Sequence, residues 1–180
     1  MSETFARRPR TEIIIAIAAT IVSICAMVTT VYQTYILRQQ QHAAVWPRLQ
    51  LSNAYWVTSD TAFYQLYITN NGIGPAIIRE VSIEYEDSLY LTTAGLAQKI
   101  ARQNDLPDSV AYQNYRDLFP DMVIPQQETW MLLEILKREY VIPFVEKRED
   151  KAIKITVNYE SLYGESWEVG YPGLLHRKID

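Results

Sequence analysis

Residues Ile153 to Glu160 read IKITVNYE, and this stretch predicts the fold class of the chain. Isoleucine, valine and tyrosine occupy every second position, and lysine, threonine, asparagine and glutamate fill the positions between them. Successive side chains of a β-strand point to opposite faces of the sheet, so this period of two predicts a strand with one buried and one exposed face. Such half-buried strands are typical of antiparallel sheets that pack face to face.

The same alternation recurs along the chain after Pro47, with turn residues between its occurrences. Six or seven strands of this kind predict a mainly β domain, an antiparallel β-sandwich of immunoglobulin-like class. The length of the segment 47–180 suits one domain with one core. Besides 153–160, we expect strands at about 48–52, 64–69, 80–86, 129–136 and 166–171.

Helical patterns interrupt the strands between residues 93 and 121, which predicts a helical insertion into the sandwich. One helix is expected over Leu96–Gln103 and a second over about Ser109–Phe119, each stopped by a proline that follows it. A third short helix is expected to begin at Pro143 and to run to Asp150. Segments inserted between strands often carry binding surfaces, so these helices are candidates for function.

A turn is predicted where residues 68–76 read ITNNGIGPA, because Asn and Gly tolerate positive φ and Pro75 restarts an extended strand. With the alternating strand after it, this stretch resembles the strand–turn–strand core of CARDB-like and other immunoglobulin-like bacterial adhesion modules. The order of apolar helix, Trp46-Pro47, this turn and the segment 159–164 (YESLYG) with Trp167 looks like a group of uncharacterised bacterial single-pass membrane proteins. The resemblance implies a β-sandwich and carries no activity with it.

No side chain is charged from Ile13 to Leu37, and this predicts a helix that spans a membrane once. At ~1.5 Å per residue such a helix reaches ~37 Å, against a hydrocarbon core of ~30 Å. A signal peptide has a shorter apolar region and a small-residue cleavage site, so an uncleaved anchor is expected. The chain then divides into an N-terminal tail (1–12), a transmembrane helix (13–37), a helical stalk (38–46) and the β domain (47–180).

Arginines on the two sides of the predicted span indicate its orientation. Arg7, Arg8 and Arg10 precede the helix, and Arg38 and Arg48 follow it. The positive-inside rule, applied to three arginines against two, favours a cytoplasmic N-terminus. We therefore expect a single-pass protein of the inner (cell) membrane with its C-terminal domain in the periplasm or otherwise outside the cytoplasm.

The predicted transmembrane helix has one face of small residues and, on roughly the opposite side, one of bulky isoleucine, valine and tyrosine. Small residues let helix backbones approach closely in lipid, whereas bulky ones suit contact with acyl chains. The small face predicts a seam that binds a second copy or the helix of a protein partner; the alternative is a chance alignment. The predicted packing residues are Ala16, Ala19, Ser23, Ala26, Thr30 and Gln33.

Residue types that support catalysis or metal binding are scarce in the β domain. His176 is its only histidine and Cys25 lies in the predicted span, so neither a zinc site nor a Cys–His nucleophile is expected. Glu84, Glu86 and Asp87 offer calcium ligands, but on an alternating strand they form a solvated face. Paired carboxylates for glycoside hydrolysis stay open, because no pair stands out. We expect no cofactor, no metal and no enzyme.

Acidic residues outnumber basic ones, 21 against 17, and the β domain has no basic run. This charge pattern argues against nucleic acid as a partner. The leading hypothesis is a non-catalytic, membrane-anchored interaction or scaffold protein. The alternative is a ligand-binding or sensory module that reads a glycan or small molecule, and an enzyme of unrecognised type is third.

Aromatic residues are abundant, with 13 Tyr and four Trp. Phe63 and Tyr67 alternate out of phase with the expected core residues of their strand, and Trp130 is out of phase with Met131 and Leu133. Outward aromatics mark a partner or glycan surface, which makes Phe63, Tyr67 and Trp130 candidate contact residues. The interpretation that we favour from the sequence is that they lie under the inserted helices as a second small core.

Overall fold

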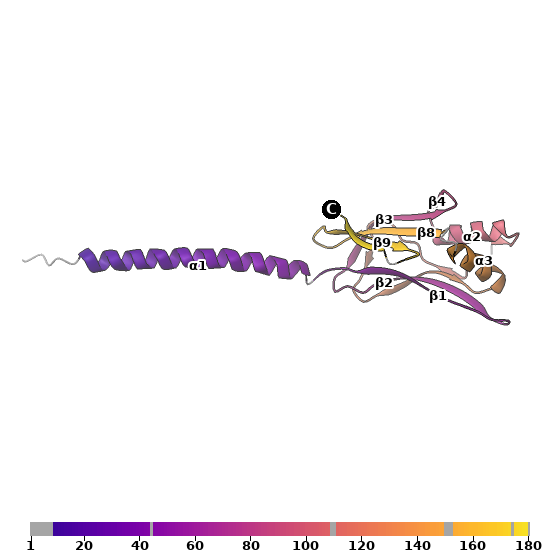
Figure 1. Cartoon of the computed structure of the whole chain (residues 1–180), viewed down its shortest axis with the longest axis horizontal. Helices are drawn as coiled ribbons and strands as arrows, with labels where there is room; N and C mark the ends of the chain where they lie inside the picture. Colours follow the sequence, from indigo (N-terminus) through magenta and orange to yellow (C-terminus); the bar gives the residue numbers. More distant parts are fainter. Residues whose placement is uncertain (1–8, 44, 109–110, 150–152, 174, 180) are drawn as a thin grey trace, which may run out of the picture. The chain divides into compact units, whose positions relative to one another are not determined.

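A computed structural model describes residues 9–43, 45–108, 111–149, 153–173 and 175–179 (Figure 1). The chain divides into two compact units, Met1–Ala43 and Ala44–Asp180. Arg7 and Arg8, on which the predicted orientation partly rests, lie outside the described residues.

The first unit contains one helix, α1 (Pro9–Ala43), which extends beyond the predicted span at both ends. Its stretch Thr11–Gln41 is long and apolar enough to cross a membrane. Five hydroxyl groups each donate a hydrogen bond of 2.8–2.9 Å to the carbonyl four residues earlier, so they need no partner outside the helix. These hydroxyls belong to Thr20, Ser23, Thr29, Thr30 and Thr34.

The second unit is mainly β and consists of two antiparallel sheets, which confirms the predicted fold class. Its strands are β1 (Leu49–Val57), β2 (Ala62–Asn70), β3 (Ala76–Tyr85), β4 (Ser88–Tyr90), β5 (Asn114–Tyr115), β6 (Val123–Ile124), β7 (Thr129–Ile135), β8 (Ile153–Glu160), β9 (Ser166–Tyr171) and β10 (Leu175–Ile179). The four-stranded sheet has the order β1-β2-β7-β5. The six-stranded sheet has the order β10-β9-β8-β3-β4, with β6 also paired to β3.

The core lies between the two sheets and follows the predicted alternation. In β8, Ile155, Val157 and Tyr159 are buried, and the residues between them are partly or fully exposed. In β2, Tyr64, Leu66 and Ile68 are buried in the same alternating way. The apolar faces of the two sheets pack against each other and exclude water. This burial is the main favourable contribution to the free energy of folding.

Two helices fill one end of the sandwich between the sheets (Figure 1): α2 (Thr93–Gln103) and α3 (Arg138–Glu149). The side chain of Thr92 caps α2 by accepting the N–H of Gly95 at 2.9 Å. The ring of Phe144 in α3 lies 4.7 Å from the ring of buried Tyr64, centroid to centroid. The inserted helices therefore pack on the inner side of the four-stranded sheet.

The predicted helix over 109–119 is wrong for the part that the structure describes. Residues 109–110 lie outside it, and the following residues form the short strand β5 at the edge of β7. The N–H of Gln113 donates to the carbonyl of Glu134 at 2.7 Å, and that of Arg116 donates to Leu132 at 3.2 Å. The free edge of β7 thus satisfies the backbone groups that a helix would have paired internally.

The third predicted helix begins earlier than expected, at Arg138, and Pro143 lies inside it rather than in its first turn. Four residues of this helix are buried: Tyr140, Val141, Phe144 and Val145. Tertiary packing therefore stabilises the whole helix, of which the sequence pattern predicted only the second half. Asp150, the predicted end of this helix, lies outside the described residues.

Asn70 is completely buried at the end of β2, and its amide connects segments of both sheets. Its Oδ1 accepts the N–H groups of Arg48, at 3.1 Å, and Gly72, at 3.0 Å. Its Nδ2 donates to three carbonyl oxygens at 2.8–3.2 Å, those of Gly74, of Ile124 in β6 and of Pro125, the residue after β6. One side chain thus joins the start of β1, the 71–74 loop and a strand of the six-stranded sheet.

The two glycines of this loop are required by close approach of the backbone, not by positive φ as the sequence suggested. Positive φ among described glycines occurs at Gly164 and Gly173. A Cβ on Gly72 would collide with the backbone of Trp46 and Arg48, and one on Gly74 with the backbone of Val45.

Replacement of Asn70 should destabilise the sandwich far more than replacement of its neighbour. Asn70→Ala leaves buried donors and acceptors without partners, at about 1–3 kcal/mol per group, so we expect a loss of at least about 3 kcal/mol. Asn71→Ala removes one exposed bond, to Gln50, and should cost about 0.5 kcal/mol or less. Urea unfolding of the segment 45–180 measures both, and equal losses would contradict the role given to Asn70.

Candidate functional site

The outer faces of the two sheets differ in chemistry. The outer face of the six-stranded sheet is mostly polar and charged, with the exposed Leu89 opposite Glu84 as an apolar exception; it carries Glu80, Ser82, Glu84, Lys154, Thr156 and Asn158. On the four-stranded sheet, Trp56 lies opposite Phe63, and Tyr67 lies opposite Met131. Residues directly opposite in an antiparallel pair share a face, so these four side chains all point outward.

Polar side chains on the outer face of the four-stranded sheet hold its aromatic residues in place. The hydroxyl of Tyr67 donates to Oε1 of Gln65 at 2.6 Å, and Nε2 of Gln65 donates to Oε1 of Glu134 at 2.7 Å. Trp56 remains 59% exposed, while Phe63 and Tyr67 are partly buried by their neighbours. The result is an ordered, mostly uncharged surface that offers aromatic rings to solvent.

Trp130 lies on the opposite side of this sheet from Phe63 and Tyr67. A register shift between β2 and β7 adds one residue, Leu132, to β7 and reverses the phase of the residues before it. Trp130 therefore lies opposite Ile68, on the core side, where the guanidinium of Arg116 is 4.8 Å from its ring centroid. It packs against the core and so does not belong to the outer surface.

The inserted helices do not cover Phe63 and Tyr67, because the ring contact between Phe144 and Tyr64 places α3 on the inner side of the sheet. The interpretation that Phe63 and Tyr67 form a second small core under these helices is therefore wrong. Trp56, which the sequence analysis did not single out, joins them. Continuing the alternation from Leu49 and Leu51 would have indicated its outward direction.

A second candidate site is a cavity of about 260 Å³ at the flank of the sandwich, between the start of β1 and strands β9 and β10. Leu49, Leu51 and Val169 supply apolar walls, and Arg48 and His176 supply polar ones. Two lining residues, Leu49 and His176, contact the hydroxyl of Tyr159, whose ring stacks on Trp167 at 5.8 Å. Trp167 in turn lies 6.5 Å from Trp46.

His176 belongs to a chain of hydrogen bonds with Tyr159 and Leu49. The hydroxyl of Tyr159 accepts the N–H of Leu49 at 3.1 Å and lies 2.7 Å from Nε2 of His176. Because burial raises the pKa of Tyr159 to about 12, this hydroxyl keeps its proton at neutral pH. Burial, and then the charge of Arg48, lower the pKa of His176, which favours the neutral imidazole; which of the two groups donates depends on the tautomer of His176.

The lowered pKa of His176 predicts a pH dependence of stability. A histidine whose folded pKa lies below its unfolded value of about 6.5 contributes stability above that pH and loses it as the pH falls. His176→Gln should therefore reduce the loss of stability on acidification. Arg48→Gln should raise the pKa of His176 only in part, because burial is the larger cause. An NMR titration of the imidazole measures this shift, and a pKa unchanged in Arg48→Gln would contradict the assignment.

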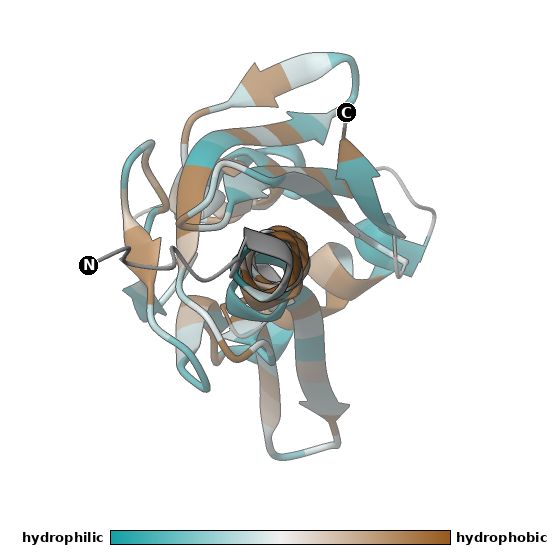
Figure 2. Cartoon of the chain, turned by 90° about the vertical axis from the view of Figure 1, so that its left-hand side faces the viewer, coloured by the Kyte–Doolittle hydropathy of each residue, from teal (hydrophilic) through white to brown (hydrophobic). Residues whose placement is uncertain are grey.

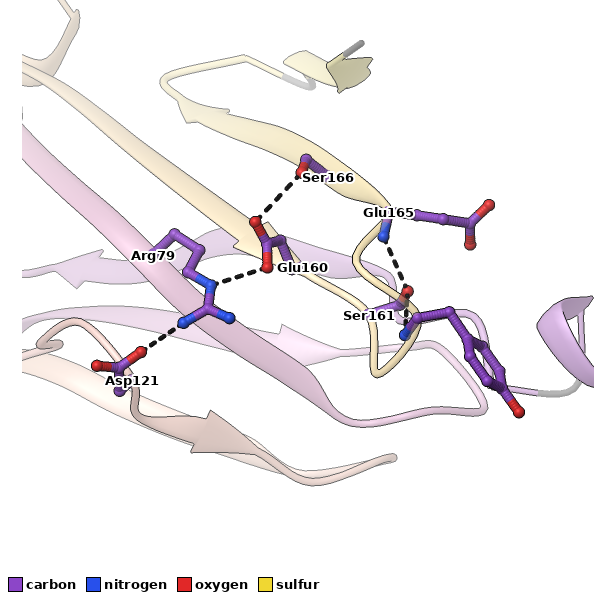
Figure 3. Close-up of polar contacts among 7 residues, drawn as sticks. Arg79, Asp121, Glu160, Ser161, Glu165 and Ser166 are labelled. Carbon is purple, nitrogen blue, oxygen red and sulfur yellow. Dashed lines mark hydrogen bonds and ion pairs between the residues drawn. The ribbon is translucent and has the colours of Figure 1, made fainter.

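Figure 3 shows an ion network on the six-stranded sheet that centres on Arg79. A β-bulge leaves Arg79 unpaired in β3 and turns its guanidinium between two carboxylates. Its Nε lies 2.9 Å from Glu160, and its Nη1 lies 2.5 Å from Asp121, which is 79% exposed. Exposed pairs of this kind contribute little stability. Backbone hydrogen bonds hold the 119–122 turn against β3: Ile78 donates to Met122 and Asp121 donates to Ile78, each at 2.8 Å.

In the turn between β8 and β9, the side chain of Ser161 accepts hydrogen bonds from backbone N–H groups (Figure 3). Its Oγ accepts the N–H groups of Tyr163, at 3.2 Å, and Glu165, at 3.3 Å. Ser161 is buried and committed to this turn, so it has no geometry for nucleophilic attack. Across the described ranges, no three His, Cys, Asp or Glu residues gather in a way that holds a metal ion.

Glu84, Glu86 and Asp87, which the sequence favours as a solvated face over a calcium site, lie at the β3–β4 hairpin, and Glu86 contacts other side chains. Glu86 accepts the amide of Gln103 at 2.5 Å and lies 3.9 Å from the ammonium of Lys147. The first of these contacts is the larger cause of the lowered pKa of Glu86. These partners account for its charge without an ion.

The predicted seam residues form a stripe along α1, and their side chains are exposed within the chain. The hydroxyls of Ser23 and Thr30 are already paired within the helix. Gln33 makes no side-chain hydrogen bond with any described residue, so it is the polar member of the stripe that is free to bond across it.

Comparison with known proteins identifies a family. No curated protein and no solved structure matches the chain. The family model described as "Domain of unknown function (DUF8453)" matches residues 11–171. The match includes the apolar helix and the sandwich as far as β9, so it treats the helix and the sandwich as parts of one arrangement. The chain belongs to the DUF8453 family.

Proposed function

We propose that this protein is a non-catalytic, single-pass membrane protein whose β-sandwich binds a protein partner through the outer face of its four-stranded sheet. The observation that carries the proposal is the contrast between the two outer sheet faces. One is mostly polar and charged, as a solvated face is, whereas the other exposes Trp56 beside Phe63 and Tyr67. Aromatic residues on a mostly uncharged surface are enriched in protein interfaces and are frequent anchors of binding energy.

Membrane attachment through α1 is part of this proposal, with the N-terminus in the cytoplasm and the sandwich outside it, at the inner (cell) membrane. The length and apolar character of Thr11–Gln41 support the span, and the three arginines before it support the orientation. Self-association or capture of a partner helix through the small-residue face of α1 would bring binding partners together within the bilayer.

We also infer an immunoglobulin-like relationship for the sandwich. An immunoglobulin constant-type domain pairs strands A-B-E-D in one sheet and C-F-G in the other. If β1, β2, β3, β5, β7, β8 and β9 are read as A to G, the sheets here have the orders A-B-E-D and G-F-C. The connectivity supports the class; β4, β6 and β10 are additions to it, and β4 continues the six-stranded sheet beyond C.

The orientation is tested by reporter fusions after Asp180 in the full chain. Because three arginines precede the span and two follow it, a reporter active only outside the cytoplasm should be active, and one active only in the cytoplasm should be silent. The reverse pattern would place the sandwich in the cytoplasm. Removal of residues 11–41 should release the protein from the membrane fraction into the soluble fraction.

The partner surface is tested by photocrosslinking in intact cells. With p-benzoylphenylalanine in place of Trp56 or Tyr67, we expect a discrete crosslinked product, because both rings point outward from the same sheet face. The matched control places the same residue at Glu84, on the outer face of the other sheet. Crosslinked products that form equally from position 84, or from position 84 alone, would contradict the assignment of this face as the partner surface.

A further inference from the structure

The two sheets of the sandwich differ in width at one flank. β1 is the edge strand of the four-stranded sheet and lies against β9. The six-stranded sheet continues past β9 to β10, and no described strand of the smaller sheet lies beyond β1. Figure 2 shows β10, which ends beside the C-terminus label, as mostly hydrophilic. The edge of β1 at this flank is therefore unpaired with any described strand.

β1 lacks the features that protect sheet edges from strand addition. Proteins guard an edge by making the strand short or by adding charges, proline or bulges. The edge strand β10 carries His176, Arg177 and Lys178, and β4 and β5 span only three and two residues. β1 spans nine residues, reads LQLSNAYWV with no charge or proline, and pairs with β2 in unbroken register.

The backbone groups on the free edge of β1 follow from its pairing with β2. The N–H of Asn71 donates to the carbonyl of Arg48, so Arg48 turns its backbone toward β2. Pairing alternates along an antiparallel strand, so the N–H and C=O groups of Leu51, Asn53 and Tyr55 point away from β2. The first group in this series, the N–H of Leu49, is already taken by the hydroxyl of Tyr159.

Charge at one end of this edge selects the direction of an added strand. Arg48 lines the flank cavity and makes no ion pair with any described residue. A peptide that runs antiparallel to β1 arrives at Arg48 with its C-terminus, whereas a parallel one arrives with its N-terminal amine. The guanidinium attracts a carboxylate and repels an amine, so it favours the antiparallel direction.

We propose that an extended peptide adds to the free edge of β1 in the antiparallel direction, with its C-terminal carboxylate at Arg48 and its last side chain in the flank cavity. The apolar walls from Leu49, Leu51 and Val169 suit an aliphatic last side chain. A second copy of β1 paired here in the antiparallel direction would bring the 58–61 turn to Arg48, and not a free chain end. This site is separate from the outer face of the sheet and does not depend on the proposed function.

The test uses the full chain in lipid nanodiscs and two pools of randomised hexapeptides. The pools are equimolar and differ only in a free C-terminal carboxylate or an amide, with an isotope label to tell them apart. We expect at least a tenfold excess of the free acids among retained peptides by mass spectrometry, because a single charge-assisted contact to Arg48 discriminates to about this degree. Arg48→Gln should abolish the excess, and Arg138→Gln, an exposed arginine at the start of α3, should leave it unchanged.

Strand addition itself is tested on the peptide side, which leaves the protein fold untouched. Two versions of a retained peptide carry N-methyl groups at alternate residues, in one phase or the other. One phase should abolish binding and the other should not, since only alternate N–H groups face β1. Equal retention of acids and amides, an excess that survives Arg48→Gln, equal loss in both phases, or no retention at all would each overturn the proposal.

Discussion

The buried amide of Asn70 satisfies backbone groups from three segments that share no strand pairing with one another. It accepts from Arg48 and Gly72 and donates toward Gly74, Ile124 and Pro125. A buried polar group without partners would cost about 1–3 kcal/mol, so the segments must meet at this amide with little freedom. The start of β1, the direction of β6 and the close approach of the chain at Gly72 and Gly74 all follow from that constraint.

Two β-bulges then decide which side chains each sheet presents. In β7 the extra residue Leu132 moves Trp130 to the core side and leaves Met131 beside Tyr67 on the outer face. In β3 the extra residue Arg79 leaves the ladder, and its guanidinium turns to Glu160 and Asp121. A bulge shifts every later residue of its strand to the opposite face, so one inserted residue changes the chemistry of a whole surface.

The alternation in the sequence predicted the core strands because burial of one face leaves a period of two, as in Ile153 to Tyr159. It could not reveal the bulge at Leu132, since Met131, Leu132 and Leu133 are all apolar and either phase fits them. The expected helix over 109–119 failed for a related reason: β5 exists because β7 offers a free edge, a tertiary contact that local propensity does not encode. Among the candidate site residues, Phe63 and Tyr67 lie where the alternation placed them, and Trp130 does not.

The open flank at Arg48 is limited in length by a second polar cluster farther along β1. There Arg148 of α3 donates to the hydroxyl of Tyr171 at 2.9 Å, which lies 2.8 Å from the hydroxyl of buried Tyr64. Burial raises the pKa of Tyr64 well above its usual range, so the hydroxyl of Tyr64 keeps its proton at physiological pH. Arg148 also reaches Oδ1 of Asn53, at 3.3 Å. The inner side of β1 is thus closed at α3, and the cavity is confined to the end where Arg48 lies, which makes no ion pair with any described residue.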